Sequence, residues 1–130
     1  MTPVAYVDAS ALVKLVVEEP ESRSMFHWYV ESGRLATSQI GIIETRRAAN
    51  RRSHDPAHLE SVLRSLVILE VDDVVAGSAS RVTPVGLRTL DAIHLVTALA
   101  MGAELDAFVT YDDRLADAAR ALGLPVVRPA

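Results

Sequence analysis

The chain has 130 residues, half of them hydrophobic, which is enough for one domain with an apolar core, and we expect residues 1–130 to form a single domain. It has no cysteine, which excludes disulfides, thiolate metal sites and cysteine nucleophiles. We find no signal peptide and no apolar run near the roughly 20 residues of a membrane span, so a cytoplasmic protein is the simplest interpretation. The net charge of −4 differs from that of a generic nucleic-acid binder, which is usually basic.

Strands and helices alternate along the first half of the chain. Val4–Val7 is a short apolar run typical of a strand, and Leu35–Thr37 indicates a second strand. Asp55-Pro56 is a strong helix start, with aspartate as the cap and proline in the first turn. The expected helices are Ser10–Glu19, Glu21–Glu31, a segment capped by Ser38 that ends near Arg52, and a segment from Asp55 to about Leu66.

The same alternation continues in the second half. The expected strands are Val67–Val71, Ala107–Thr110 and Pro125–Val127. The expected helices run from Asp72 or Asp73 to about Val82, from a Thr89 cap to about Met101, and over Asp113–Leu122, with Gly102 and Gly123 as stops. Strands that alternate with helices indicate an α/β fold in which a central parallel sheet carries helices on both faces.

Several acidic residues follow the predicted strands, where an open parallel sheet binds its ligands. Asp8 comes directly after the first strand, and Asp112 lies just beyond the strand Ala107–Thr110. Asp106 precedes that strand and therefore belongs at the opposite edge of the sheet. Two further acids also follow a strand, so their position alone does not exclude them: Asp72 and Asp73.

Two more acids are expected on helices near the same edge. Asp91 lies in the first turn of a helix that is apolar nearly all round and should be buried. A carboxylate in such surroundings needs a partner or a metal, and the nearby Arg88 is one candidate partner. Glu44 lies about one and a half turns into the helix that Ser38 caps, from where it could lean towards the strand ends.

Each of these acids also has a local explanation. Asp8 and Asp112 can cap helices, Asp91 can be a favourable charge in a first turn, and Glu44 can pair with Arg47. Together they are harder to explain, because two like charges about 4 Å apart repel by roughly 4 kcal/mol at an effective dielectric constant of about 20. A cluster of acids at one sheet edge therefore indicates a site for a hard divalent cation, Mg²⁺ or Mn²⁺.

The lysine content weakens other interpretations of an acidic α/β site. Lys14 is the only lysine, whereas receiver domains and haloacid-dehalogenase-type phosphatases need one late in the chain. Those phosphatases also need Asp-x-Asp where this sequence has Asp8-Ala9-Ser10. No P-loop or dinucleotide-binding glycine pattern is present. An α/β phosphatase or signalling domain is therefore the weaker alternative, and a metal-activated water would need no protein nucleophile.

Four stretches together resemble the acidic motifs of PIN-domain nucleases, in order and in spacing over essentially the whole chain. They are Val7–Leu15, Ile43–Ala48, Leu87–Leu95 and Phe108–Leu115, of which the third is the most specific. Within the PIN domains the chain looks most like the VapC toxins of bacterial type II toxin–antitoxin pairs. The resemblance implies a cytoplasmic endoribonuclease that uses Mg²⁺, or Mn²⁺ in its place, to hydrolyse RNA phosphodiester bonds with an activated water.

The same resemblance implies roles for particular residues and partners. The family's acidic positions, which are both catalytic and metal-binding, fall on Asp8, Glu44, Asp91 and Asp112. Ser10 and Thr110 fall where a hydroxyl commonly lines the site, and Asp113 is either a second-shell partner or a charge at a helix start. The implied protein partner is a small VapB-like antitoxin whose tail occupies the acidic groove, and the implied oligomer is a homodimer. Met25–Tyr29 is one candidate partner surface, and a helix packing its own aromatic side chains is the alternative.

Two further features of the sequence indicate function more weakly. Arg46, Arg47 and Arg51 form a basic cluster beside Glu44 that either holds RNA phosphates or is a solvated helix face. His94, three residues after Asp91, is either a structural histidine with satisfied hydrogen bonds or a group near the metal. Two rival functions remain, a catalytically silent PIN-fold binding module and a DNA nuclease that uses the same site.

Overall fold

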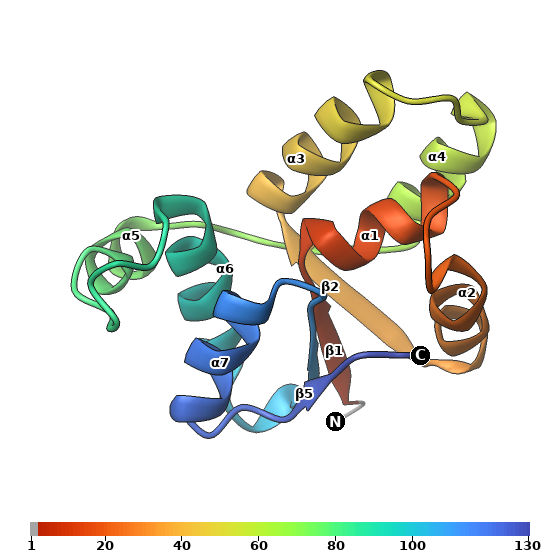
Figure 1. The fold of residues 1–130 in the computed structure, drawn as a ribbon. Coiled ribbons are helices and arrows are strands. Elements are labelled where there is room, and N and C mark those ends of the chain that lie inside the picture. Colours follow the sequence, from red (N-terminus) through yellow and green to blue (C-terminus); the bar gives the residue numbers. More distant parts are fainter. Residues whose placement is uncertain (1–2) are drawn as a thin grey trace.

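The computed structural model describes residues 3–130, in which five parallel strands form one sheet (Figure 1). The strand order is β3-β2-β1-β4-β5, so the first strand of the chain lies in the middle. All neighbouring strands pair in parallel, and their carboxyl ends therefore meet at one edge of the sheet. The strands are β1 (Val4–Val7), β2 (Arg34–Ser38), β3 (Val67–Leu69), β4 (Leu105–Val109) and β5 (Val126–Val127).

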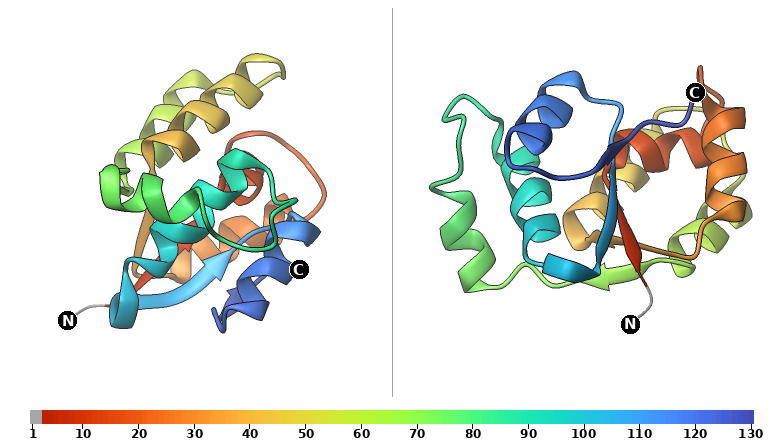
Figure 2. Two further views of the ribbon diagram at one scale, coloured as in Figure 1. Left: turned by 90° about the vertical axis from the view of Figure 1, so that its left-hand side faces the viewer. Right: turned by 90° about the horizontal axis from the view of Figure 1, so that it is seen from below.

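Helices cover both faces of this sheet, which confirms the predicted α/β architecture. Figure 2 shows α1, α2 and α4 on one side and α5, α6 and α7 on the other. The helices are α1 (Ala9–Val16), α2 (Ser22–Glu31), α3 (Gln39–Asn50), α4 (Pro56–Arg64), α5 (Asp73–Ala79), α6 (Thr89–Leu99) and α7 (Asp113–Ala121), with a short 3₁₀ turn over Gly102–Glu104. No helix within residues 3–130 is long and apolar enough to cross a membrane.

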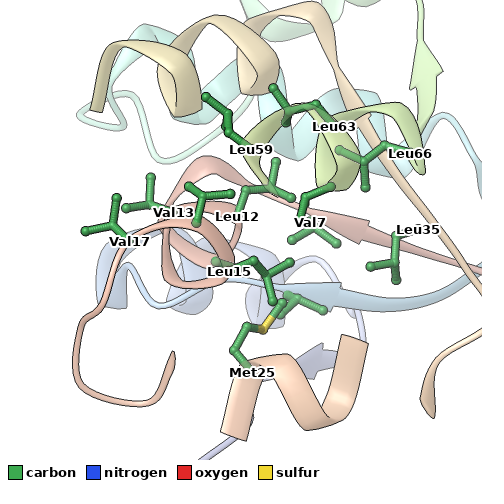
Figure 3. Close-up of a cluster of buried hydrophobic side chains, with 14 of the residues drawn as sticks. Val7, Leu12, Val13, Leu15, Val17, Met25, Leu35, Leu59, Leu63 and Leu66 are labelled. Carbon is green, nitrogen blue, oxygen red and sulfur yellow. The ribbon is translucent and has the colours of Figure 1, made fainter. Parts of the chain in front are cut away.

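The two faces have separate hydrophobic cores because side chains of a strand alternate between them. Ala5 and Val7 point into the core shared with α1, α2 and α4, whereas Tyr6 and Phe108 point into the core shared with α6 and α7. Figure 3 shows the first core, where Met25 from α2 lies close to Leu15 of α1, and Leu59 and Leu63 from α4 lie on the other side of α1. Each large apolar side chain buried in this way contributes about 1.5–3 kcal/mol.

Aspartate side chains begin several of the helices. Asp8 accepts from the Ala11 amide at 3.1 Å at the start of α1, and Asp112 accepts from the Leu115 amide at 2.9 Å at the start of α7. Asp55 caps α4 with Pro56 in its first turn, as the sequence predicts. The capping explanations for Asp8 and Asp112 are therefore correct, and any further role of these two residues adds to the cap.

Some predicted boundaries are wrong for reasons that lie outside the local sequence. α1 ends at Val16 instead of Glu19, because the Ser22 hydroxyl accepts from the Glu19 amide and donates to the Val17 carbonyl, which holds the following loop extended. Asp106 lies inside β4 and not before it.

The cap of α6 is a second difference. Thr89 is the first helical residue, and Arg88 takes the cap position without a side-chain bond to the helix amides. The Arg88 guanidinium instead donates to the carboxylates of Asp91 and Asp112. Ser38 does precede α3, as predicted, but its hydroxyl makes no cap hydrogen bond.

Candidate active site

Asp8 is held in a buried cage of hydroxyl groups at the carboxyl end of β1. Its Oδ1 accepts from the Ser10 hydroxyl at 2.7 Å and its Oδ2 from the Thr110 hydroxyl at 2.6 Å. The Thr110 hydroxyl also accepts from the Asp112 amide at 3.0 Å. Because β1 and β4 are neighbours in the sheet, residues 102 positions apart in the chain become direct partners.

The electrostatic state of Asp8 reflects this enclosure. Only 3% of the residue is exposed, and burial raises the pKa of its carboxyl above the usual value. The Thr110 and Ser10 hydroxyls oppose that shift because each of them donates a hydrogen bond to the ionised form. A buried carboxylate that keeps its charge is a strong attractor for a cation.

Asp91 and Asp112 are joined by one arginine. The Arg88 guanidinium donates from Nε to Asp91 Oδ2 at 3.2 Å and from Nη2 to Asp112 Oδ2 at 3.0 Å. Burial raises the pKa of Asp91, and repulsion from Asp112 raises it further, whereas Arg88 lowers it. Because Asp112 raises the pKa of Asp91, the two acids lie within electrostatic reach, so the predicted third and fourth acids belong to one site.

Glu44 reaches the same region from α3, and its partner is a histidine. His94 Nε2 lies 2.6 Å from Glu44 Oε1, and the buried ring is 1% exposed. Asp8 and Glu44 both help to raise the pKa of Tyr6, and Glu44 acts on Arg88 together with Asp91 and Asp112, so the four acids lie within electrostatic reach of one region. The predicted alternative, a helical pair between Glu44 and Arg47, is not the pair that forms.

Two other predicted site residues lie apart from this group. Asp113 is exposed and pairs with Arg128 at 2.7 Å, away from the carboxylate of Asp112. Arg46 makes a two-pronged salt bridge with Glu60 on α4. The guanidinium of Arg46 is therefore engaged on the far side of α3 from Glu44.

A groove of about 520 Å³ lies beside Glu44 and is lined by Arg47 and Arg51, the other two residues of the predicted basic cluster. Arg47 lines it from α3 and Arg51 from the position just after α3, and neither makes a salt bridge within residues 3–130. Lys14 also lines the groove, but Glu19 and Glu21 neutralise its charge. The groove therefore combines one catalytic candidate with two unpaired positive charges.

The chemistry of these side chains fits a hard divalent cation. Carboxylates and hydroxyls are oxygen ligands of the kind that Mg²⁺ and Mn²⁺ prefer. Within residues 3–130, Asp91 Oδ1 and Glu44 Oε2 receive no hydrogen bond, so both oxygens keep their lone pairs available. In the same part of the chain no three acidic or histidine side chains are grouped tightly enough to form a ready-made metal site. To bind a cation, Asp91 and Asp112 would therefore have to share their carboxylate oxygens between Arg88 and the cation, or lose their hydrogen bonds to Arg88.

Comparison with known proteins places the chain in a family. A sequence profile of the PIN domain matches residues 5–121. The chain belongs to the PIN domain family. Two relatives from Mycobacterium tuberculosis, named ribonuclease VapC46 and ribonuclease VapC35, are 39% and 43% identical to it, and each match covers 95% of this chain and 96% of the relative. It is therefore a PIN domain of the VapC type.

Solved structures show the same fold at lower sequence similarity. The crystal structure of Mycobacterium tuberculosis VapC20, described as a sarcin-ricin loop cleaving toxin, superposes with a TM-score of 0.75 at 18% identity, over 97% of this chain and 99% of that one. The structure of FitAB bound to a DNA fragment gives a TM-score of 0.69 at 15% identity, over 97% and 94% of the two chains. These likenesses confirm the PIN fold.

Two polar residues of this PIN site have roles that the sequence did not reveal. Arg88 was considered only as a partner of Asp91, although it also bonds to Asp112. Tyr6 looks like an ordinary strand residue, yet its hydroxyl lies 2.7 Å from His94 Nδ1. An arginine three residues before a buried aspartate is a signal that could have been followed further, whereas nothing local marks Tyr6.

Proposed function

We propose that this PIN chain is an endoribonuclease that hydrolyses RNA phosphodiester bonds with the help of Mg²⁺ or Mn²⁺, as the toxin of a VapC-type toxin–antitoxin pair in the bacterial cytoplasm. The observation that carries the proposal is that Thr110 and Arg88 link Asp8, Asp112 and Asp91 at the carboxyl edge of the sheet. Glu44 joins this group because it lies within electrostatic reach of Arg88. The ribonuclease names of relatives that match nearly the whole chain support RNA as the substrate.

In this proposal the four carboxylates Asp8, Glu44, Asp91 and Asp112 hold the cation. When bound, it supplies Lewis-acid chemistry: it activates a water for in-line attack and stabilises charge on the phosphate oxygens. The Ser10 and Thr110 hydroxyls keep Asp8 oriented and ionised, because both donate to its carboxylate. No side chain has to act as a nucleophile.

The groove beside Glu44 is the proposed path of the RNA backbone. Arg47 lies on α3 and Arg51 directly follows its last residue, and both are exposed and line this groove. Guanidinium groups bind phosphate through paired N–H donors, so two unpaired arginines can hold successive phosphates next to the acidic site. Arg46 is assigned no part in RNA binding because Glu60 already occupies its guanidinium.

The proposed protein partners are a VapB-like antitoxin and a second copy of the chain. The VapC type of the relatives supports the antitoxin, and the FitAB neighbour was solved as a complex. In the predicted partner segment Met25–Tyr29, Met25 is completely buried, whereas Phe26 is 44% exposed. Light scattering after gel filtration, with and without co-expressed antitoxin, measures both assemblies.

The decisive experiment is cleavage of RNA by purified chain in Mg²⁺, in Mn²⁺ and in EDTA, with DNA of matched sequence as a parallel substrate. Asp91→Asn, prepared in the same way, exposes any contaminating ribonuclease, and Asp117→Asn on the exposed face of α7 is the matched control. We expect the wild type and Asp117→Asn to cut RNA only with metal. Metal-independent cutting, or equal cutting by Asp91→Asn, would refute the proposed site, and cutting of DNA alone would make the chain a DNA nuclease.

Neighbouring aspartates allow a second, sharper test of the fourth acid. Asp112→Asn and Asp113→Asn are the same chemical change one residue apart, and asparagine also caps helices well. Because Asp112 bonds to Arg88 and Asp113 only to Arg128, we expect the first variant to lose at least 100-fold in cleavage rate (an order-of-magnitude estimate) and the second to lose little. The reverse result would assign the fourth position to Asp113.

A further inference from the structure

His94 is a fully buried polar side chain whose two ring nitrogens both have partners. Its Nδ1 lies 2.7 Å from the Tyr6 hydroxyl, and its Nε2 lies 2.6 Å from Glu44 Oε1. Neither partner is a backbone group, so the ring serves no turn, cap or strand. It connects a strand in the centre of the sheet with one of the four acids, across three separate elements of the fold.

The chemistry of the partners determines where the protons lie. An ionised carboxylate can only accept a hydrogen bond, so His94 Nε2 must carry a hydrogen and donate it to Glu44. The Nδ1 of a neutral ring is then an acceptor, and the Tyr6 hydroxyl is its donor. Burial raises the pKa of Tyr6 far above its usual value, so this phenol keeps its proton.

The fold holds this chain of hydrogen bonds rigidly. Tyr6 has no exposed surface and stacks on Phe108, with 5.6 Å between the ring centres and only 5° between the planes. Gly41 lets α3 approach closely, since an added Cβ would lie 2.1 Å from Thr37 Oγ1 and 3.4 Å from the His94 ring. Glu44, one turn further along α3, is therefore fixed by both its backbone and its Oε1.

We infer that Tyr6 and His94 are positioning residues for Glu44: the Tyr6 hydroxyl holds the imidazole in place at Nδ1, and the imidazole holds one oxygen of Glu44 so that the other is left for the cation. This inference rests on the proposed function, because it assigns Glu44 a cation to face. The bonded groups around a ligand carboxylate influence its orientation as much as its own backbone does.

The test compares Mn²⁺ affinity, measured by calorimetry, with thermal stability for variants of each link. His94→Asn is too short to reach Glu44 and should weaken Mn²⁺ binding about 10-fold or more, whereas His94→Gln can still donate from the Nε2 position and should recover most of the affinity. Tyr6→Phe removes one oxygen atom and should weaken binding about threefold or more, because it acts through the ring. In RNA cleavage, His94→Asn and Tyr6→Phe should lower kcat and leave KM nearly unchanged, whereas His94→Gln should recover most of kcat.

The matched control is His58→Asn. This partly buried histidine donates to the Leu15 carbonyl at 2.7 Å and touches none of the four acids. Its loss should lower the melting temperature without changing the Mn²⁺ affinity. If the His94 and Tyr6 variants behave in the same way, with lower stability and unchanged affinity, the two residues are structural and the inference is wrong.

A spectroscopic measurement separates this inference from the proposed function. In EDTA-treated protein labelled with ¹⁵N-histidine, we expect the His94 ring to be protonated at Nε2 and unprotonated at Nδ1. Tyr6→Phe should shift the Nδ1 resonance, because it removes the hydrogen bond at that nitrogen. A ring protonated at Nδ1 alone would overturn the positioning role even in an active enzyme. If wild-type protein shows the expected tautomer but neither binds Mn²⁺ nor cuts RNA, the proposed function is wrong. Tyr6 and His94 would then not position Glu44 for a cation.

Discussion

Thr110→Val tests most directly whether hydroxyl groups hold the acidic site together. Valine keeps the branched shape of threonine and removes only the hydroxyl, which is buried, donates to Asp8 Oδ2 at 2.6 Å and accepts from the Asp112 amide at 3.0 Å. Losing a hydrogen bond to a charged group costs about 1.5–3 kcal/mol, and an unpaired amide adds about 1 kcal/mol. We expect a loss of about 2–4 kcal/mol in the free energy of unfolding, which lowers the melting temperature by about 10 °C in a chain of this size.

Two other buried threonines make the comparison specific. The Thr97 hydroxyl donates only to the Ile93 carbonyl within α6, so Thr97→Val should cost about 1 kcal/mol or less. Among the residues of the described chain, the buried Thr45 hydroxyl has no partner, so Thr45→Val should be neutral or stabilise by up to about 1 kcal/mol. Urea unfolding in EDTA at neutral pH measures all three. If Thr110→Val costs no more than Thr97→Val, the hydroxyl cage around Asp8 is not what holds this edge of the fold.

Three further predictions concern the acids and the approach of α3. Asp91→Asn should leave EDTA-treated protein about as stable as wild type, because it removes both a carboxylate that burial and Asp112 destabilise and the pair of that carboxylate with Arg88. Mn²⁺ should no longer raise the melting temperature of this variant. A rise as large as in wild type would exclude Asp91 as a ligand. Because burial raises the folded pKa of Asp8 above 3.8, its contribution to stability is greatest below that pH and is lost as pH rises through the folded pKa. Asp8→Asn in EDTA should therefore lose less stability than wild type as the pH rises from about 4, and parallel pH profiles would contradict this. Gly41→Ala should destabilise the fold by about 1–3 kcal/mol, because the added Cβ would overlap Thr37. At Gly77 in α5 the atom nearest to an added Cβ is 3.7 Å away, so Gly77→Ala should stabilise by up to about 1 kcal/mol in the same thermal melts.

Local chemistry explains why much of the fold could be predicted. Asp55-Pro56 starts α4 and Gly123, at φ +80°, follows the end of α7, because caps and stops depend on only a few adjacent residues. The run Val4–Val7 is bounded correctly because apolar residues before an aspartate cap can only enter the core. The end of α1 was missed because the Ser22 hydroxyl holds the Val17 carbonyl, a side-chain contact that the helical pattern does not reveal.

The position of the acids was also largely predictable. A parallel sheet brings all its carboxyl ends to one edge, so an acid that follows a strand can be placed there without knowing the strand order. Asp8 and Asp112 follow that rule, and the structure links them through Thr110. The partners of the acids could not be derived in this way, since Arg88 reaches 24 residues forward to Asp112, and His94 reaches 50 residues back to Glu44.

The sequence by itself therefore determined the α/β class, the PIN resemblance and the edge at which the acids gather, because periodicity, caps and motif spacing are local properties of the chain. Only the tertiary structure decided which charges are free and which are paired. Arg46 and Arg47 are neighbours in the sequence, yet Glu60 neutralises the first and the second lines the groove. A one-residue step turns a side chain by about 100° around a helix, so adjacent arginines face different surroundings, and only the packing of α3 against its neighbours settles which one meets the site.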